Sequence, residues 1–451
     1  MPGGLIQLVA TGAQNIFLNG NPKMSYFKKI FKTHSNFSLE SMRLNFNKTT
    51  IHTKDKTSLT CKIDRNADML QNMYFACTLP NIPKRAGEKF KYVQNLGEVM
   101  IDNYYISIGG NIISKQWGEW MHVWAELSLS SNKTYGYSKI IGNVADIFAP
   151  DDYSKKYDEG DIQVFQRKIY VPLGFWFTKI PGLALPLVSL QYHSIEVTVE
   201  LRPLIDIFTL GLSKTTYQDS TTRKPTVEEC SQYFNIQNNA LHIDPYIEAQ
   251  YIFLDTSERT FFATKNQEYL VEQVNRFSFD QLSKFNMVDI DVHNPVKEFI
   301  WVISRNDRGQ LNKWFDFTDW ETLKLNEKPK ITDTRDLSES SVNGEILRSA
   351  KFLFNGVDRL ETKDNFYYGI LQPFQHHTFI PKTGIYVYSF SLHPENFQPS
   401  GAANFSRINR IQMYMELIEP RSTEYSYEMN FYAVNYNLLN IQGGLAGLTW
   451  V

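Results

Sequence analysis

The chain has 451 residues, of which 42% are hydrophobic and 14% aromatic, and its formal net charge is −2. This length allows two or three domains or one large β unit, and the aromatic content suits β-sheets, where flat rings pack on a pleated surface. A nearly neutral chain with mixed charges lacks the basic field of a nucleic-acid-binding protein, so we expect no direct contact with nucleic acid. No apolar run approaches the ~20 residues that span a bilayer, and the N-terminus lacks the charged and apolar regions of a signal peptide. We therefore predict no transmembrane segment and an intracellular origin.

The first 25 residues form an apolar arm punctuated by glycine, with no clean helical or strand period. A terminal segment of this kind stays mobile unless it is tied down, and its apolar side chains favour burial. We predict that the arm serves assembly by reaching a neighbouring molecule, through Leu5, Ile6, Leu8, Val9, Ile16 and Phe17. The alternative is that it packs on the chain's own first domain.

The segment after the arm predicts a turn, a short helix and the first strand. Residues 19–22 (Asn-Gly-Asn-Pro) favour a turn. Phe27, Ile30 and Phe31 recur at the spacing of a helix whose other face is basic. From Phe37 the apolar period is two, with a slip of register that suggests a β-bulge.

The rest of the first half predicts short strands separated by long polar loops. Apolar residues alternate over 59–63, 73–79, 104–108, 195–201 and 246–254. Residues 130–165 and 211–244 are polar and are predicted as surface loops. Asp151-Asp152 is the best candidate for a catalytic carboxylate pair, but nothing near it supplies the dry pocket that a general acid needs.

One helix stands out between these strands. Its expected face carries Trp117, Trp120, Met121 and Trp124. Such a stripe has two interpretations: an exposed platform for sugar rings, or the buried face of a helix that plugs the end of a barrel. We predict the buried face.

The chain changes character at Asp255, which we take as a domain boundary. Asp255 and Glu258 have capping-box spacing, and the following residues predict a helical linker that enters a new strand. The second half then repeats the first: residues 106–120 correspond to 352–366 at a constant offset, and strand 195–201 resembles 411–417. Similar segments that occur in the same order in both halves predict two copies of one β unit. Two eight-stranded jelly rolls, an architecture of viral capsids, lectins and cupins, match this pattern best.

The three cysteines and the histidines show no metal-site spacing. Cys61 and Cys77 alternate with apolar residues and are predicted to face a core, whereas Cys230 is predicted in a polar loop. His376-His377 is the one close histidine pair, and because adjacent residues on a strand point to opposite faces, both cannot bind one metal. The sequence contains no GxSxG, GxxxxGK[ST] or HExxH motif. We predict no enzyme activity, no catalytic residue, no metal and no cofactor.

Several long motifs resemble the major capsid proteins of nucleocytoplasmic large DNA viruses, which are built from two jelly rolls. The resemblance covers nearly the whole chain. Besides the arm, it includes PLGFWFTKIPGLALPLVSLQYH (172–193), YIFLDTSERTFFATKNQEYLVEQV (251–274), HNPVKEFIWV (293–302), LQPFQHHTFIPKTGIYVYSFSLHPENFQPSGAANFSRINRIQM (371–413) and VNYNLLNIQGGLAGLTWV (434–451). His376, His377 and His393 fall within this pattern, which implies that they are structural residues and not metal ligands.

The resemblance implies an all-β fold of two consecutive eight-stranded antiparallel jelly rolls, with short helices and long surface loops. Its implied organisation is an N-terminal assembly arm (1–25), a first jelly roll (26–256), a helical linker (257–270), a second jelly roll (271–440) and a Gly-rich C-terminal tail (441–451). The implied function is that of a structural major capsid protein. Its homotrimers, with a pseudo-sixfold outline, would tile the icosahedral shell of a large double-stranded DNA virus.

The implied partners are further copies of the chain, neighbouring capsomers and minor capsid proteins beneath the shell, where an internal membrane can also lie. The protein would be made and assembled inside the host cell and located in the virion. The alternative function is that of a jelly-roll carbohydrate-binding or glycoside-processing virion protein that uses the Trp-rich segment or the outer loops.

Overall fold

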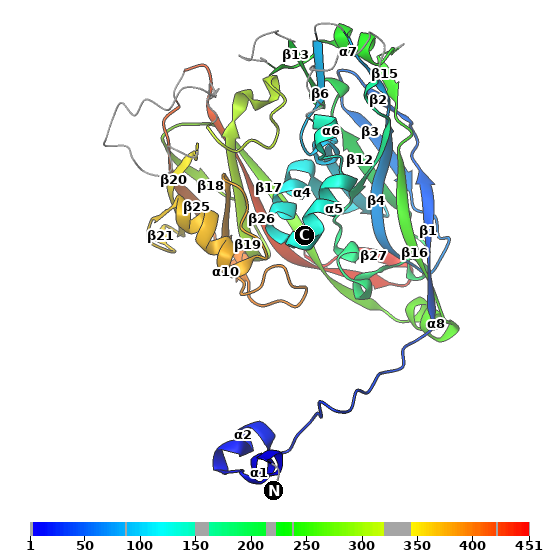
Figure 1. The fold of residues 1–451 in the computed structure, drawn as a ribbon, viewed down its shortest axis with the longest axis vertical. Helices are drawn as coiled ribbons and strands as arrows, with labels where there is room; N and C mark the ends of the chain where they lie inside the picture. The colour runs from blue at the N-terminus through cyan, green and yellow to red at the C-terminus, as the bar shows by residue number, and fades with distance from the viewer. Residues whose placement is uncertain are drawn as a thin grey trace. The chain divides into compact units, whose positions relative to one another are not determined.

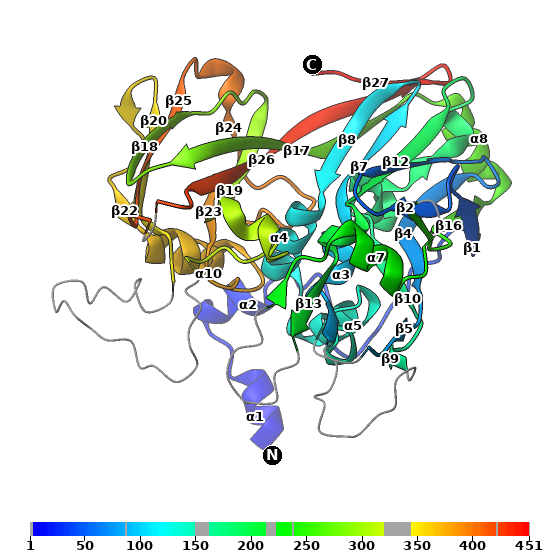
Figure 2. The same cartoon turned by 90° about the horizontal axis from the view of Figure 1, so that it is seen from above.

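The chain from Ser38 onward forms one unit built around two pairs of large antiparallel β-sheets (Figures 1 and 2). The structure is a computed structural model that describes residues 3–85, 88–148, 162–212, 222–236, 239–319, 344–420 and 423–450. The chain up to Phe37 forms a separate unit. No helix in the described ranges is long and apolar enough to cross a membrane.

The first pair of sheets contains eight main strands. One sheet has the order β1-β16-β4-β10, formed by β1 (Phe37–Asn45), β4 (Met69–Leu79), β10 (Arg167–Pro172) and β16 (Tyr246–Leu254). The other has the order β3-β12-β7-β8, formed by β3 (Thr57–Lys62), β7 (Ile101–Ile108), β8 (Asn111–Trp117) and β12 (Ile195–Leu201). Numbered in chain order, the two sheets read 1-8-3-6 and 2-7-4-5, which is the order of a jelly roll.

The second pair of sheets repeats this order. One sheet reads β17-β26-β19-β23, with β17 (Gln267–Leu282), β19 (Pro295–Arg305), β23 (Ile385–Ser389) and β26 (Tyr427–Gln442). The other reads β18-β25-β20-β21, with β18 (Phe285–Asp289), β20 (Leu347–Phe354), β21 (Val357–Asp358) and β25 (Ile411–Leu417). The prediction of two copies of one β unit is confirmed.

Shorter elements fill the connections. The short strands are β2 (Thr50–His52), β5 (Ile82–Pro83), β6 (Glu88–Tyr92), β9 (Ile162–Val164), β11 (Leu185–Pro186), β13 (Phe208–Leu212), β14 (Thr222–Arg223), β15 (Ala240–His242), β22 (Lys363–Asp364), β24 (Ala403–Asn404) and β27 (Leu445–Leu448). The α-helices are α3 (Leu96–Met100), α4 (Gly118–Ser128), α5 (Ser131–Ile140), α6 (Ala145–Phe148), α7 (Val227–Tyr233), α8 (Thr256–Thr264) and α10 (Gln372–His376). The remaining helical turns are the π-helix η7 (Tyr367–Leu371) and the 3₁₀ turns η2 (Trp176–Thr178), η3 (Pro181–Leu183), η4 (Leu187–Ser189), η5 (Leu204–Asp206), η6 (Asn306–Gln310) and η8 (Phe405–Arg407).

Each roll encloses a hydrophobic core between its two sheets. The core forms because apolar side chains alternate along the strands and so lie on one face of each sheet. In the first roll, Cys61 of β3 lies opposite Val197 of β12, and both side chains are buried. Cys77 is also buried, so both core predictions for cysteine are confirmed. In the second roll, Trp301 is fully buried, with ring centroids 5.1–6.1 Å from those of Phe352, Tyr368, Tyr386 and Phe431.

Both segments predicted as polar loops in the first half contain helices. Within 130–165 the chain forms α5 and α6, and within 211–244 it forms α7. Helix α7 begins at a capping box in which the Thr226 hydroxyl accepts from the Glu229 amide and the Glu229 side chain accepts from the Thr226 amide. The prediction for Cys230 was wrong, because this residue lies on α7 and is buried, and burial raises the pKa of its thiol to about 12.

Helix α8 lies between the last main strand of the first roll and the first strand of the second. As predicted, Asp255 caps it, with its carboxylate accepting a hydrogen bond of 2.8 Å from the Thr256 amide. The reciprocal bond from Glu258 that would complete a capping box is not formed. The bidentate contact of Arg259 with Asp68 (2.8 and 3.0 Å) ties α8 to the first roll.

The N-terminal unit consists of α1 (Gly3–Val9), η1 (Ala13–Asn15) and α2 (Ile16–Asn19), followed by residues without regular structure as far as β1. The arm therefore contains short helices that its irregular apolar pattern did not indicate. The helix predicted over residues 27–31 is absent, and Phe27 is fully exposed. A helix this short is marginal unless tertiary packing supports it, and none of these side chains is buried. The bulge predicted near the start of β1 stays a prediction.

Candidate functional site

The two jelly rolls meet at helix α4, which follows directly on β8 and lies between the two groups of sheets (Figures 1 and 2). Trp120, Val123 and Leu127 of α4 are buried. They pack on one face of the second roll's β17-β26-β19-β23 sheet, formed by Val274, Ile300, Val302, Ile385, Val387, Tyr432 and Val434. These residues alternate with core residues such as Trp301, so the face that receives α4 is the outer one.

The tryptophan stripe is thus a buried helix face, as predicted. Trp120 stacks on Trp124 with ring centroids 5.6 Å apart and lies 5.2 Å from the ring of Tyr432. It does not offer an exposed platform for sugar. Its predicted position at the end of a barrel was wrong: the outer face of the second roll's sheet is itself apolar, and α4 covers it.

A buried ion pair joins the rolls beside this helix. Glu119 of α4 lies 2.9 Å from the guanidinium of Arg308, and its other oxygen accepts from the Asn430 amide (2.6 Å) and the Tyr432 hydroxyl (2.8 Å). Arg308 also contacts Glu428 at 2.7 Å. Burial by itself raises the pKa of a carboxyl group, but the guanidinium of Arg308 and the hydrogen bonds hold the pKa of Glu119 below its ordinary value. The pair is charged and fully partnered.

A second buried cluster of charges surrounds the ring of Trp124. Lys297 contacts Glu272 at 2.7 Å, and Lys179 from the first roll pairs with the same carboxylate. The two ammonium groups lie 5.5 and 5.2 Å from the Trp124 ring centroid. Burial opposes ionisation of Glu272, but the two lysines lower its pKa to about 2. Like the Glu119 pair, this contact ties the first roll to the second.

His377 belongs to the same cluster. Its buried imidazole lies between two carboxylates, with Nε2 3.1 Å from Glu298 and Nδ1 3.0 Å from Glu395. Burial by itself lowers the pKa of a histidine, but these two carboxylates raise the pKa of His377 to about 9. A bulge in β19 between Val296 and Glu298 interrupts the strand alternation next to Lys297.

This arrangement predicts a pH-dependent contribution of His377 to stability. Its pKa is raised from 6.5 to about 9, so the imidazolium stabilises the folded state fully below pH 6.5, and this contribution is lost as the pH rises through 9. We expect the free energy of unfolding lost in His377→Gln to shrink by about 3 kcal/mol between pH 6 and pH 9.5. Urea denaturation across this range measures it. His376→Gln is the control, and equal pH profiles for the two variants would contradict the prediction.

The histidine pair does not lie on a strand as assumed. His376 ends α10 and its Nδ1 lies 3.1 Å from the Leu392 carbonyl, whereas His377 follows the helix and points to its carboxylates. The two side chains have separate partners because one ends the helix and the other follows it, and not because they alternate along a strand. The described residues contain no group of three or more His, Cys, Asp or Glu side chains suited to a metal ion.

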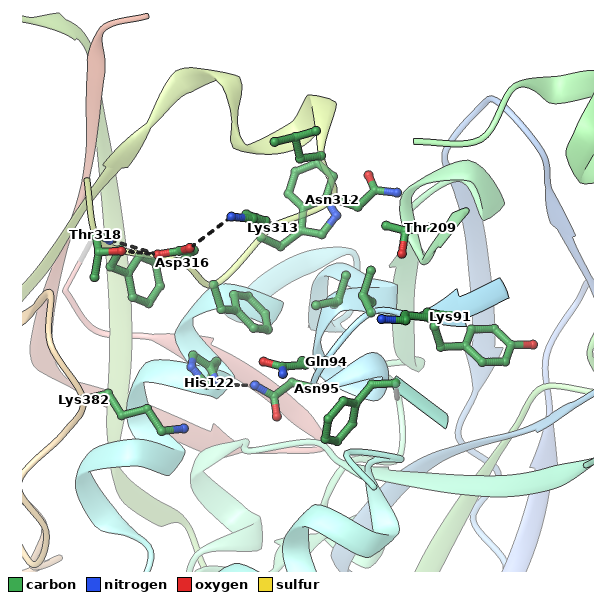
Figure 3. Close-up of a pocket in the computed structure, with 18 of the residues that line it drawn as sticks. Lys91, Gln94, Asn95, His122, Thr209, Asn312, Lys313, Asp316, Thr318 and Lys382 are labelled. Atoms are coloured by element: carbon green, nitrogen blue, oxygen red, sulfur yellow. Dashed lines mark hydrogen bonds and ion pairs between the residues drawn. The ribbon is translucent and has the colours of Figure 1, made fainter. Parts of the chain in front are cut away.

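A cavity of about 660 Å³ lies beside α4 and is lined by both rolls (Figure 3). His122 is stacked on Phe315 (4.4 Å between ring centroids) and lies 3.0 Å from the carboxylate of Glu98. Lys382 pairs with Glu126 at 2.8 Å, and Asp316 accepts from the Thr318 hydroxyl. These lining groups are bonded to neighbours, so they support the packing of the rolls and do not form a nucleophile with an activating base.

The remaining predicted residues are the carboxylate pair and the arm. Asp151-Asp152 lies outside the described residues. The arm residues Leu5, Ile6, Leu8, Val9, Ile16 and Phe17 are 48–93% exposed, and their role in assembly stays a prediction.

The sequence reasoning did not identify one exposed apolar surface, on the helical stretch 365–376 of the second roll, which contains η7 and α10. Phe366, Ile370 and Phe374 are 54%, 37% and 71% exposed. They are spaced four residues apart, so they lie on one side of the helix. The four-residue spacing of these apolar side chains is the sequence signal that could have predicted this surface.

The fold and these contacts define a double jelly-roll protein whose buried polar groups hold its parts together. Residues 25–255 match the family described as "Major capsid protein N-terminus", and residues 258–447 match "Large eukaryotic DNA virus major capsid protein". The major capsid proteins of Phaeocystis pouchetii virus and Pyramimonas orientalis virus are 32% and 31% identical to this chain, with 100% of both chains covered in each case.

Two solved structures share the fold. The PBCV-1 virus capsid, as a quasi-atomic model, has a TM-score of 0.71 at 24% identity and covers 95% of this chain and 100% of its own. The Faustovirus major capsid protein has a TM-score of 0.69 at 12% identity, with coverage of 96% and 94%. The chain belongs to the family of large eukaryotic DNA virus major capsid proteins. It is a structural component of the virion capsid, where it assembles with neighbouring subunits, and not an enzyme.

Proposed function

We propose that the chain forms homotrimeric capsomers with a pseudo-sixfold outline, which tile the icosahedral shell of a large double-stranded DNA virus. The observation that carries this proposal is the identical strand order of the two rolls. Because each chain presents two similar units, a threefold trimer has six similar corners, and such a unit packs into a hexagonal layer. We assign residues 26–256 and 271–440 to the rolls, 257–270 to the linker and 441–451 to the tail.

Analytical ultracentrifugation and electron microscopy of the purified protein test the oligomeric state. We expect a stable trimer at micromolar concentration, with an interface well above the ~1,600 Å² of a standard protein complex. Micrographs should show particles with a six-cornered outline. A monomer at this concentration would contradict the proposal.

We further propose that the N-terminal arm acts in shell closure and docks under a capsomer or on a minor capsid protein. Its apolar side chains are exposed within their own unit, from Leu5 at 48% to Phe17 at 93%. Exposed apolar side chains gain ~25 cal/mol per Å² on burial, so a partner that covers them stabilises the assembly.

Deleting residues 2–22 tests the arm. We expect the truncated protein to form trimers with a nearly unchanged melting temperature but no closed shells. The control is a full-length chain in which Lys28, Lys29 and Lys32 are replaced by glutamine, which keeps the apolar arm and should still close shells. A truncated protein that melts many degrees lower or does not trimerise would show that the arm belongs to the subunit core.

The carbohydrate-binding alternative lacks support from the tryptophan stripe, because Trp120 is 4% exposed and lies inside the contact between the rolls.

A further inference from the structure

A second, smaller cavity of about 210 Å³ is lined by both rolls and has charged walls. Three arginines from different elements line it: Arg202 directly follows β12 of the first roll, whereas Arg276 lies on β17 and Arg308 on η6. The volume is below the roughly 300–1,000 Å³ of sites for drug-sized ligands, so the cavity suits a small ion better than a larger organic molecule.

Arg202 has no hydrogen-bonded counterion. Its side chain is 13% exposed, and its Nε is buried without a hydrogen-bond partner in the described part of the chain. The carboxylate of Asp102 lies 3.8 Å from this nitrogen, beyond hydrogen-bond distance, and accepts instead from the Lys56 ammonium at 2.6 Å. Because a buried cation without a close counterion is costly, this position favours an anion beside Arg202.

Arg308 provides the comparison within the same cavity. It contacts the carboxylates of Glu119 at 2.9 Å and Glu428 at 2.7 Å. Burial by itself lowers the pKa of an arginine, but these two carboxylates raise the pKa of Arg308 above its ordinary value. At Arg202 burial prevails over the attraction of Asp102, so its pKa lies below the ordinary value. The chain thus supplies enough negative charge for Arg308 but not for Arg202.

Two of the three guanidinium groups lie on indole rings that also line the cavity. Cζ of Arg202 is 3.9 Å from the ring centroid of Trp314, and Cζ of Arg276 is 5.8 Å from that of Trp117. Stacking orients the plane of a guanidinium and leaves its N–H edge available to a ligand. Arg276 donates to the neutral side chain of Asn430, and among the described residues it forms no ion pair.

Four carboxylates line the same cavity, and three of them have cationic partners of their own. Two bind Arg308, and that of Asp102 binds Lys56. The fourth belongs to Asp280, which is exposed to solvent, where water and salt screen its charge. The positive charges of Arg202 and Arg276 are therefore available to a ligand.

We propose that this cavity binds a small oxyanion of the phosphate class, held between Arg202 of the first roll and Arg276 of the second. A planar guanidinium matches the oxygens of phosphate, which accept two parallel N–H bonds. The bound anion supplies the missing counterion and adds one more contact that ties the rolls together. The cavity lies within a single chain, so this inference goes beyond the proposed trimer and does not depend on it.

Calorimetric titration of the full-length protein with inorganic phosphate tests the site, after dialysis into phosphate-free buffer and at constant ionic strength. We expect one phosphate to bind per chain. Arg202→Gln should raise the Kd at least ~10-fold, as expected for the loss of a hydrogen bond to a charged group. Arg202→Lys keeps the charge but not the planar fork, so its Kd should be intermediate.

The control is Arg410→Gln, because the Arg410 side chain is 62% exposed and pairs with Asp289 outside the cavity. This variant should bind phosphate as the wild type does. Near-ultraviolet circular dichroism shows whether each variant has kept its fold. Equal phosphate binding by folded Arg202→Gln and wild type, or an equal response of the wild type to chloride at the same ionic strength, would overturn the inference.

Crystals of the wild-type protein soaked in selenate, a heavier tetrahedral oxyanion, give a test that needs no substitution. We expect an anomalous difference peak in the cavity, between the guanidinium groups of Arg202 and Arg276. A cavity that holds only water would refute the site. Tighter binding of adenosine monophosphate than of inorganic phosphate would also refute it, because a nucleoside needs more room than this cavity offers.

Discussion

Replacing Glu119 by alanine is expected to lower the free energy of unfolding by about 3–5 kcal/mol, the range found when one partner of a buried ion pair is removed. Glu119 is 4% exposed. The substitution takes one carboxylate from Arg308 and the acceptor from Asn430 and Tyr432, so three buried donors lose a partner. Urea denaturation at pH 7, where Glu119 is ionised in the wild type, measures the loss as a lower midpoint.

Two further variants sharpen this test. Glu119→Gln keeps the size of the side chain and one acceptor oxygen, so we expect an intermediate loss. Glu361→Ala removes a carboxylate that is 92% exposed and 3.8 Å from Lys363, and its effect should stay below ~1 kcal/mol because surface ion pairs contribute little. If Glu119→Ala costs no more than this surface control, the ion pair does not hold the rolls together.

Trp120→Ala is expected to cost about 3–5 kcal/mol and to weaken the coupling between the rolls. Trp120 sits in the cluster that joins α4 to the second roll's sheet. The second roll has a core of its own, and the core of the first roll also takes in Val271, Leu439 and Ile441 from β17 and β26. Removing the indole leaves both cores intact but empties the centre of the contact between them. We therefore expect calorimetry to show a broadened or split transition where the wild type has one.

Phe285→Ala is the matched control for this variant, because Phe285 is a large aromatic residue that is 56% exposed on β18. Its effect should lie within ~0.5 kcal/mol, as is usual for surface substitutions. Hydrogen exchange adds a local test, since the amides of β19 and β26 under α4 should exchange faster in Trp120→Ala. A single transition with a loss similar to that of Phe285→Ala would contradict the prediction.

The sequence by itself determined the repeated β architecture. Alternation such as that of Leu59, Cys61 and Ile63 defines which side of a strand is apolar, and burial of one side is what drives sheets to pair. The constant offset from residues 106–120 to 352–366 showed the repeat, because equal folds place equivalent strands at equivalent spacing. The N-cap of α8 at Asp255 could also be predicted from the sequence, because capping involves only neighbouring residues.

Only the tertiary structure decided what each apolar surface meets. The period of the tryptophan helix showed that one face is buried, but its partner is a sheet more than 140 residues further along the chain. Similarly, the residues around His377 in the sequence do not predict its contact with Glu298, because only folding brings these two distant residues together. The spacing of Phe27, Ile30 and Phe31 predicted a helix that the structure lacks, and none of these side chains is buried against a packing partner. Local periodicity reports the shape that a segment can take, whereas burial depends on surfaces that folding brings together from distant parts of the chain.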